Sequence, residues 1–499
     1  MRGFNILILV NILILGIVAL LTACEPNDQY PYRLDIEQQV SCPYSECSIE
    51  IEYTITGSEG SVTGLGITAT SDAEWITVLN TSVEGLLTVG VEQNFGDERS
   101  ATIKLTAPET RSAEIRLTQL AKREDIVEHC AIHYFFGTSL GRYFNTNVAD
   151  AATAIADGAL GSENRYVYLK QSSRSEASIV EICYDATNGS AVEQHIADII
   201  IDATKSNAEN IAANIALIME AIPAESYGII LAGHGQGWVT REVLNSDNAT
   251  EFAAKWGYDP WAKALGAEQT RAFGEYNTQS DITELAEGLR LEGGEKFDYL
   301  LFDACFMSNI ETLYDLRNVA EVIIASPCEI MGSGFPYHRT LRYLMAGEER
   351  SYERAAESYY LYYRDEYSGS ARCGSIALVE CSQIEALAEA TRAVVATARE
   401  QYDATTIQTY EGQYVHTFYD FAQWCEAVAT DEAAYQAFEQ QLARTIPAKY
   451  TLPTFYSALG SGGTLDIDVE RYSGVTTSAP CEPYQESWRE TSWYKAVWE

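Results

Sequence analysis

The sequence predicts two folded parts: a small all-β sandwich, then a larger α/β domain with a mostly parallel sheet covered by helices on both faces. Between residues 34 and 121, apolar and polar residues alternate along short runs, which is typical of half-buried strands. From residue 125 onward, short apolar runs alternate with helical patterns, which is typical of a parallel sheet between helical layers. A chain of 499 residues is long enough for two or three domains.

The first part is predicted to be a sandwich because four runs have the period-two pattern of strands, with turn sequences between or beside them. These runs are IEIEYTITG, LLTVGVEQ, ATIKLTA and AEIRLTQL. The part resembles a BACON domain, an immunoglobulin-like module of secreted proteins, at Trp75, Val89, Val91, Asn94, Arg99, Ala101, Ile103, Leu105, Ile115, Leu117 and Gln119. The resemblance implies carbohydrate binding or a spacer role. We expect Trp75 to lie in the core rather than to form a platform for sugars.

The second part, residues 125–499, contains six apolar runs that predict strands over 130–137, 165–170, 177–184, 227–233, 297–305 and 319–326. The segment NIAANIALIMEAI places Ile at three- and four-residue steps and predicts a helix. The segment SDITELAEGL predicts another, with Glu284 at a capping-box position. In such sheets, sites form beyond the carboxyl ends of the strands, which is where His234 and Cys305 fall.

The N-terminus predicts export. Arg2, an apolar stretch and the sequence Leu-Thr-Ala-Cys24 are typical of a signal peptide over residues 1–23. Its end resembles a bacterial lipobox, which implies a lipid-modified Cys24, a polar tether over 24–33 and anchoring to a bacterial membrane, at the outer membrane or cell surface. The alternative is an uncleaved N-terminal membrane anchor. Among the ten later cysteines, Cys42 and Cys47 are close enough in sequence to pair.

The charge restricts the partners. The chain has 33 basic and 72 acidic residues, a formal charge of −39, which disfavours nucleic acid and attracts cationic partners such as basic peptides. The alternative is that the charge serves solubility. No HExxH, paired CxxC or P-loop motif is present, so the sequence predicts neither a zinc site nor nucleotide chemistry, and no required cofactor.

Two predicted strands end in side chains that suit acyl transfer. His234 lies among three glycines in AGHGQGW, and Cys305 follows a strand and precedes a helix predicted over 308–318. A thiol at a helix start has a lowered pKa, and its thiolate is a nucleophile. The glycines allow close backbone approach, so the amides of Gly235 and Cys305 can hold an oxyanion while His234 protonates the leaving amine. The alternative for Cys305 is a buried structural cysteine.

Residues from about 127 to the C-terminus resemble the clostripain-like cysteine peptidases, relatives of caspases, gingipains and legumains. The blocks that carry the resemblance are PAESYGIILAGHGQGW, TRAFGEY, LLFDACFMSNIE, IIASPCEIMGSGFPY, YVHTFYDFAQW and SWYKAVW. It implies a caspase-like αβα sandwich and a His234–Cys305 dyad. It further implies that Asp303 lines a specificity pocket for Arg or Lys, together with Ser326. The alternative for Asp303 is a structural carboxylate bonded to loop amides.

The chain also departs from this family. Pro327 and Cys328 replace a more polar stretch, so Glu329 is the candidate for a second pocket carboxylate. Cys328 lacks the strand-to-helix context of a nucleophile. Relatives are often zymogens cut in the region of residues 240–280, and the candidate sites for self-cleavage here are Arg241, Lys255, Lys263 and Arg271. Some relatives use calcium, but no EF-hand loop is present and no ligands can be placed.

The sequence therefore predicts an exported cysteine endopeptidase that cleaves after Arg or Lys, and it offers the segment 240–280 for self-processing. Its predicted partners are proteins or peptides with basic residues, a membrane reached through the lipid anchor, and glycans at the β-sandwich, but not nucleic acid. The alternative function is a catalytically inactive surface adhesin or glycan-binding lipoprotein.

Overall fold

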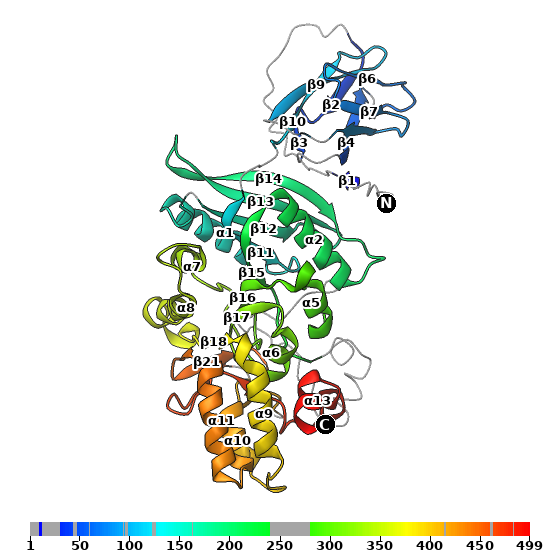
Figure 1. The fold of residues 1–499 in the computed structure, drawn as a ribbon. Helices are drawn as coiled ribbons and strands as arrows, with labels where there is room; N and C mark the ends of the chain where they lie inside the picture. The colour runs from blue at the N-terminus through cyan, green and yellow to red at the C-terminus, as the bar shows by residue number, and fades with distance from the viewer. Residues whose placement is uncertain are drawn as a thin grey trace.

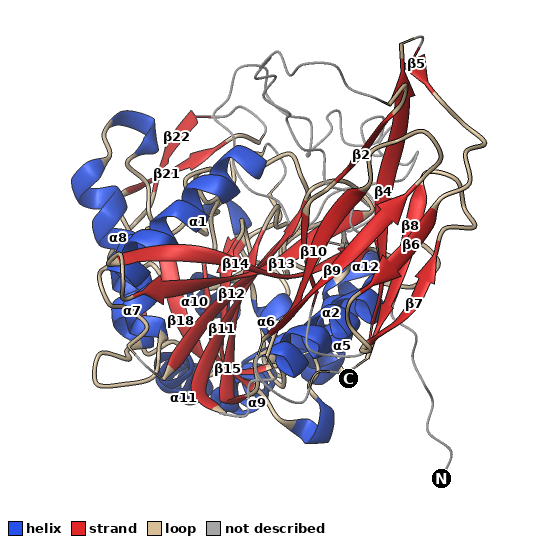
Figure 2. Ribbon diagram, turned by 90° about the horizontal axis from the view of Figure 1, so that it is seen from above, coloured by secondary structure: helices blue, strands red, loops and turns tan. Residues whose placement is uncertain are grey.

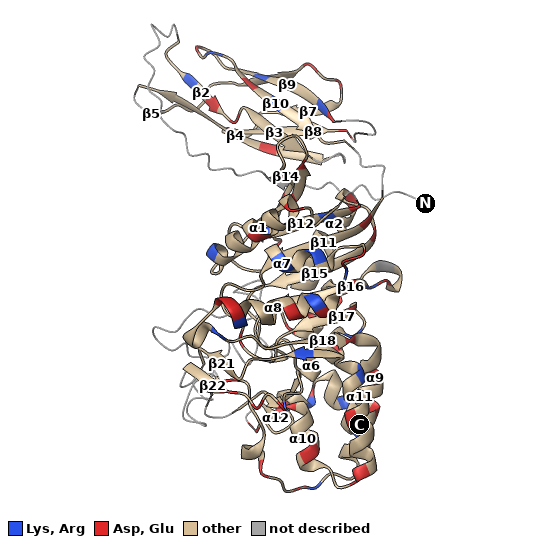
Figure 3. Cartoon of the chain, turned by 90° about the vertical axis from the view of Figure 1, so that its left-hand side faces the viewer, with Lys and Arg blue, Asp and Glu red and all other residues tan. Residues whose placement is uncertain are grey.

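The computed structural model describes residues 9–11, 30–42, 47–58, 60–92, 94, 98–121, 126–161, 163–239, 280–413, 416–459, 463–482 and 484–499. These residues form a β domain and a larger α/β domain (Figure 1). Each domain has its own hydrophobic core, one between residues 40 and 117 and one between residues 127 and 497. Acidic residues occur along both domains (Figure 3).

The β domain consists of two sheets. One contains β1 (Leu9–Asn11), β2 (Arg33–Ile36), β4 (Cys47–Gly57), β5 (Gly60–Ser61), β7 (Ile76–Asn80) and β8 (Leu86–Val91). The other has the order β3-β10-β9-β6, formed by Gln39–Cys42, Ala113–Gln119, Arg99–Thr106 and Thr68–Ser71. The four predicted runs coincide with β4, β8, β9 and β10, so the sandwich-like arrangement of short strands is confirmed.

Trp75 packs against the core of the β domain, as predicted. The guanidinium of Arg99 lies 4.5 Å from the centre of its ring. Arg99 also donates to the Gln119 side chain at 2.8 Å and to the Glu92 carbonyl at 2.9 Å. The indole face is therefore covered by a side chain that is itself held in place.

The α/β domain is built on a nine-stranded sheet with the order β14-β13-β12-β11-β15-β16-β17-β18-β20. The five strands from β12 to β17 in this order are parallel, and the strands at both ends are antiparallel. In the same order, the bounds are Ser190–Ile200, Glu176–Asp185, Asn164–Gln171, Val127–Phe135, Ala224–Ala232, Phe297–Asp303, Ala320–Ala325, Ile376–Glu380 and Ala448–Tyr450.

Helices pack in two groups against this sheet (Figure 2). The first group is α1 (Gly141–Ala156), α7 (Tyr337–Leu344) and α8 (Tyr352–Glu366). The second is α2 (Asn207–Ala221), α5 (Ile282–Gly288), α6 (Ile310–Leu316), α9 (Ile384–Val395), α10 (Phe421–Val428), α11 (Glu432–Thr445) and α13 (Ser492–Trp498). The short helix α12 (Gln485–Arg489) and two ribbons, β19 (Tyr419–Asp420) with β23 (Thr476–Thr477) and β21 (Thr454–Ser457) with β22 (Gly463–Asp466), complete the domain.

The prediction for the start of α5 was wrong in one respect. Asp281 is the N-cap residue, but no side chain caps this helix, and Glu284 does not close a capping box. Its carboxylate instead accepts a hydrogen bond at 3.0 Å from the backbone N–H of Asn207, at the start of α2. The complete capping box lies in α2 itself, between Ser206 and Glu209.

The predictions for export fall largely outside the described residues. Cys24 and most of residues 1–23 are not described. No helix in the described part of the chain is both long and apolar enough to cross a membrane.

Candidate active site

Neighbouring parallel strands bring the predicted residues to one edge of the sheet. Phe135 of β11 pairs with Ala232 of β15, and Ala232 pairs with Asp303 of β16. The Gly233 N–H continues this pairing by donating to the Asp303 carbonyl at 3.3 Å. His234 and Cys305 each lie two residues beyond the last paired level. The carboxyl ends of β15 and β16 therefore lie at one edge of the sheet, as the strand-end rule predicts.

We call residues 233–238 the His234 turn and residues 304–308 the Cys305 turn. Close contacts require glycine at two positions of the His234 turn. A Cβ atom on Gly235 would lie 3.0 Å from the Cys305 amide nitrogen and closer still to the Cys305 carbonyl oxygen, whereas ordinary Cβ contacts begin at 3.4 Å. Gly237 has a left-handed φ of 60°, and a Cβ atom there would lie 3.0 Å from the Phe306 carbonyl oxygen. The His234 turn and the Cys305 turn thus touch through their backbones, with no room for side chains between them.

Cys305 is buried, with 1% of its surface exposed. The backbone N–H of Ile330 points at its sulfur, with a nitrogen–sulfur distance of 3.3 Å, and the Ile330 carbonyl oxygen lies 3.8 Å from the same sulfur. The Ile330 N–H can donate to a thiolate, whereas the Ile330 carbonyl accepts from the neutral thiol, so this residue contacts both forms of the side chain. The next residue, Phe306, has a left-handed φ of 57°, a conformation that costs about 1–3 kcal/mol and clusters at functional sites.

The helix after Cys305 is shorter than predicted. The sequence predicts it over 308–318, but α6 runs from Ile310 to Leu316. Asn309 is its N-cap and accepts the Thr312 N–H at 3.1 Å, because an Asn side chain can satisfy an unpaired amide at a helix start. Cys305 therefore precedes the cap by four residues, and the nearby amide of Ile330 replaces the expected helix end as the donor beside the sulfur.

Asp303 is completely buried at the end of β16. Its Oδ2 accepts the Tyr337 hydroxyl at 2.9 Å and the Phe335 N–H at 3.4 Å. Gly334 has a left-handed φ of 65°, and a Cβ atom there would lie 2.6 Å from the other carboxylate oxygen. The carboxylate is thus surrounded by the loop before α7, an arrangement compatible with either a pocket floor or a structural role.

Ser326 is also completely buried, directly after β17. Its hydroxyl accepts the Cys328 N–H and donates to the Cys328 carbonyl, both at 3.1 Å, while its own carbonyl accepts the Ser308 N–H at 3.0 Å. Glu329 accepts the Ser457 hydroxyl at 2.6 Å and the Ala458 N–H at 2.8 Å. The hydrogen bond from Ser308 to Ser326 therefore connects the end of β17 to the Cys305 turn.

The other reactive candidates lie in apolar surroundings. Cys328 packs in a small cluster with Tyr410, Phe455 and Tyr472, and burial raises the pKa of its thiol well above the usual range. His133 is completely buried in β11, and its Nδ1 lies 2.7 Å from the Tyr166 hydroxyl. The expectations that Cys328 is not the nucleophile and that His133 is a core residue agree with these surroundings.

Two neighbours of the site were not predicted. Ser139 follows β11 at the same sheet edge, and its hydroxyl lies 3.2 Å from Nε2 of His234. The strand-end rule applied to β11 would have pointed to it. Phe418 stacks on Phe306 at 4.9 Å, and its ring would contact a Cβ atom on Gly237 at 3.1 Å. No local pattern marks this contact, because the two rings are far apart in sequence.

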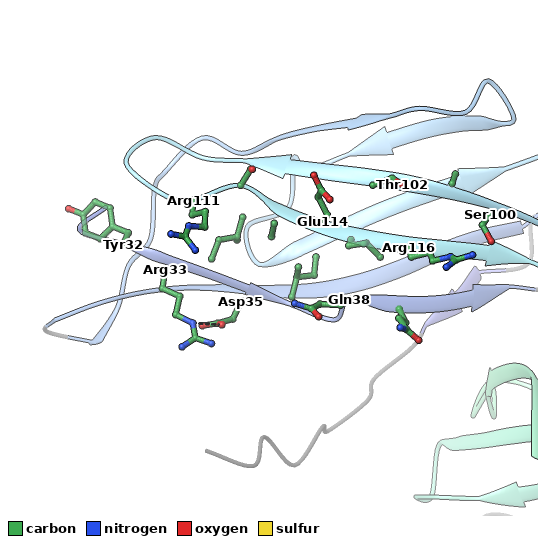
Figure 4. A pocket seen from close by; sticks show the side chains of 16 residues that line it. Tyr32, Arg33, Asp35, Gln38, Ser100, Thr102, Arg111, Glu114 and Arg116 are labelled. Carbon is green, nitrogen blue, oxygen red and sulfur yellow. Dashed lines mark hydrogen bonds and ion pairs between the residues drawn. The ribbon is translucent and has the colours of Figure 1, made fainter. Parts of the chain in front are cut away.

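The β domain carries a separate groove of about 1140 Å³ between β2 and β10 (Figure 4). Arg111, Arg116 and Glu114 line one side, and Arg33 and Asp35, which form an ion pair at 2.7 Å, line the other. For metals, the described residues contain no group of three or more His, Cys, Asp or Glu side chains suited to hold an ion.

Comparisons with known proteins agree with this geometry. The clostripain family pattern matches residues 175–443, more than half of the chain. A secreted C11 cysteine protease from Bacteroides thetaiotaomicron, iotapain, has 27% sequence identity and a TM-score of 0.63, covering 75% of this chain and 100% of its own. An inactive zymogen C11 protease from Parabacteroides distasonis shares the fold, with 24% identity and a TM-score of 0.60, covering 75% of this chain and 99% of its own. A search of curated proteins gives no match.

Three observations agree: the strand ends are paired, the His234 and Cys305 turns are in contact, and the family match covers more than half of the chain. This protein has the caspase-like αβα fold behind a small β domain, and it belongs to the clostripain family of cysteine peptidases.

Proposed function

We propose that the chain is an exported cysteine endopeptidase that cleaves after Arg or Lys, with His234 and Cys305 as its catalytic dyad. The observation that supports this most directly is the contact between the two turns, where Gly235 has no room for a side chain against the Cys305 backbone. In a cysteine peptidase this closeness lets one carbonyl group of the substrate meet both turns at once.

In the proposed reaction, the Cys305 thiol gives its proton to His234, and Sγ attacks the carbonyl carbon of the scissile peptide bond. The amides of Gly235 and Cys305 stabilise the negative oxygen that develops. His234 transfers a proton to the leaving amine as the C–N bond breaks, which leaves a thioester on Cys305. Water then attacks the thioester, the peptide acid departs, and the thiol is restored. The Ile330 amide beside the sulfur supports the thiolate in the first step.

We assign Asp303 and Ser326 to the pocket for the basic side chain. Asp303 is two residues from Cys305 and completely buried, and a carboxylate in such surroundings binds a cation strongly through charge-assisted hydrogen bonds. The same proposal expects Asp303→Asn to lose most of the preference for basic residues while a peptide with a neutral residue is still cleaved at its original low rate. A preference that stays unchanged would assign Asp303 to the structural role instead.

The experiment that tests the proposed function uses residues 25–499 and four fluorogenic peptides ending in Arg, Lys, Ala or Asp. Cys305→Ala is expected to abolish cleavage after Arg and Lys, and Cys328→Ala, a matched change at a neighbouring buried thiol, is expected to preserve it. Cleavage after another residue would retain the dyad and exclude the basic pocket. If no peptide is cleaved, even after trypsin has cut the segment 240–280, the result would favour the alternative function of an inactive surface adhesin or glycan-binding lipoprotein.

Activation and anchoring are parts of the same proposal. We propose self-cleavage after Arg241, Lys255, Lys263 or Arg271, because these side chains match the proposed pocket; this segment lies largely outside the described residues. An active enzyme that remains full-length would contradict it. We also propose lipidation at Cys24, for which labelling by a radioactive fatty acid should disappear in Cys24→Ser. Calcium dependence is tested by assaying activity with and without a chelator.

We also propose that residues 34–121 form a BACON-like module that lifts the peptidase, residues 125–499, off the membrane and binds glycans in the groove between β2 and β10. Its polar lining, with Arg111 and Arg116 beside a carboxylate, suits hydroxyl and acidic groups of a polysaccharide. Binding of polysaccharides by residues 25–121 should weaken in Arg111→Ala. Equal binding by the variant, or none by the parent, would leave the spacer role.

A further inference from the structure

Glu311, on the first turn of α6, is a completely buried carboxylate that the proposed reaction does not use. Its Oε1 accepts three hydrogen bonds, from the Ser478 N–H at 2.9 Å, the Thr477 hydroxyl at 3.0 Å and the Trp488 indole N–H at 2.8 Å. Burial raises the pKa of Glu311 above the usual range. A buried acid is costly unless it is well bonded, so this arrangement calls for a role beyond filling space.

Two of these donors, Thr477 and Ser478, belong to a short segment that also contacts the Cys305 turn. We call residues 474–478 the clasp. The Thr476 N–H donates to the Ser308 carbonyl at 3.0 Å, and the Ser308 hydroxyl donates to the Gly474 carbonyl at 2.7 Å. The clasp is thus bonded to the chain just after Cys305 at Ser308 and, through Ser478, at Glu311.

The clasp also reaches the His234 turn. Trp238, four residues after His234, donates its indole N–H to the Ser478 hydroxyl at 2.7 Å. Its ring also meets the edge of Tyr484, with 6.5 Å between ring centres, so the indole is fixed on a second side. Ser478 therefore joins the two turns, because its N–H is held by Glu311 and its hydroxyl holds Trp238.

We propose that Glu311 is a positioning residue that sets the distance between the His234 and Cys305 turns by holding Ser478, and through it Trp238. The inference rests on the proposed function, since it requires these two turns to carry the dyad. The hydrogen bonds of Glu311 go to the clasp and to Trp488, so its proposed effect on the two turns is transmitted through the clasp. A displacement of about 1 Å at reacting atoms can cost about a hundredfold in rate, so a loosened clasp should lower kcat.

The hydrogen-bonding pattern predicts which substitution of Glu311 retains kcat and which lowers it. All three donors meet Oε1, and Oε2 has no hydrogen-bond partner among the described residues. The amide oxygen of Gln can take the place of Oε1, whereas Met fills similar space with no strong acceptor. We therefore expect Glu311→Met to lower kcat at least tenfold with KM changed less than threefold, and Glu311→Gln to retain kcat within about threefold of the parent.

The test compares these variants with Trp238→Phe, which removes the indole donor and keeps an aromatic ring. If the two residues act through one chain of contacts, the kcat losses of Glu311→Met and Trp238→Phe should not multiply in the double variant. The matched control is Glu181→Met, which removes a buried Glu, 2% exposed, from β13 near Arg165. It should lower the melting temperature but not kcat. All assays are run below the lowest melting temperature in the set.

The outcomes are decisive in each case. Unchanged kcat in Glu311→Met, a loss equal to that of Glu181→Met, or multiplying losses in the double variant would overturn the inference. If Glu311→Met does not fold, Trp238→Phe decides alone, because a parental kcat there shows that the clasp does not set the His234 turn. Cys305→Ala is measured beside them. Full activity in that variant would refute the dyad, a failure distinct from one confined to the clasp variants.

Discussion

Gly235→Ala is the sharpest test of the contact between the two turns. The added methyl group would lie 3.0 Å from both the Cys305 amide nitrogen and the Met307 sulfur, and closer to the Cys305 carbonyl oxygen. Two of these three atoms are backbone, so the strain cannot be relieved by rotating a side chain. The turns must separate by about 1 Å, which predicts a loss of about a hundredfold in kcat/KM. Overpacking of this kind also costs about 1–3 kcal/mol of stability.

The assay is hydrolysis of arginyl and lysyl fluorogenic peptides, together with thermal unfolding. The control is Gly141→Ala at the first residue of α1, where an added Cβ atom meets nothing within 4 Å. Alanine there should preserve activity and should not lower the melting temperature, because the added methyl group meets no other atom. Parental activity and melting temperature in Gly235→Ala would show that the turns do not depend on this contact.

Three further predictions concern other buried positions. Burial lowers the pKa of His129, so the neutral ring stabilises the fold above about pH 6.5, and this contribution is lost as pH falls through the lowered pKa. In denaturant titrations, the difference in free energy of unfolding between the parent and His129→Gln should therefore become smaller from pH 7.5 to pH 5. A difference that stays constant would contradict a lowered pKa of His129. Gly228→Ala would place a methyl group 2.6 Å from the Tyr299 hydroxyl oxygen and closer to its ring, so unfolding should become easier by about 1–3 kcal/mol; an unchanged melting temperature would refute this. Cys328→Ala should retain peptidase activity within about threefold and lose some stability because its thiol fills a closed apolar cluster, whereas inactivity of a folded variant would question Cys305 as nucleophile.

The central sheet and the location of the site could be predicted because both follow from local patterns. The runs around residues 227–233 and 297–305 are continuous and apolar, as strands buried on both faces must be, and they are β15 and β16. Adjacent parallel strands end at one edge, so His234 and Cys305 could be brought together without knowledge of the rest.

Other features could not be predicted because they depend on contacts between distant residues. The edge strand β14 has only a weak apolar pattern and is defined by its pairing with β13. Glu284 has the right spacing for a capping box, yet its carboxylate accepts a hydrogen bond from Asn207 at the start of α2 instead. The bond between Trp238 and Ser478 joins positions 240 residues apart, and no local signal marks either partner.

The pairing of β15 with β16 has a practical consequence. These strands are hydrogen-bonded from Ile229 with Leu300 to Ala232 with Asp303, but the chain makes a long excursion between them. The sheet and the shared core hold the strands together independently of that covalent link. We therefore expect that the chain can be produced as two polypeptides that assemble, one containing β15 and His234 and the other containing β16 and Cys305. Each polypeptide should be inactive alone, and peptidase activity should appear when the two assemble. The fold is therefore a candidate scaffold for fragment-complementation assays.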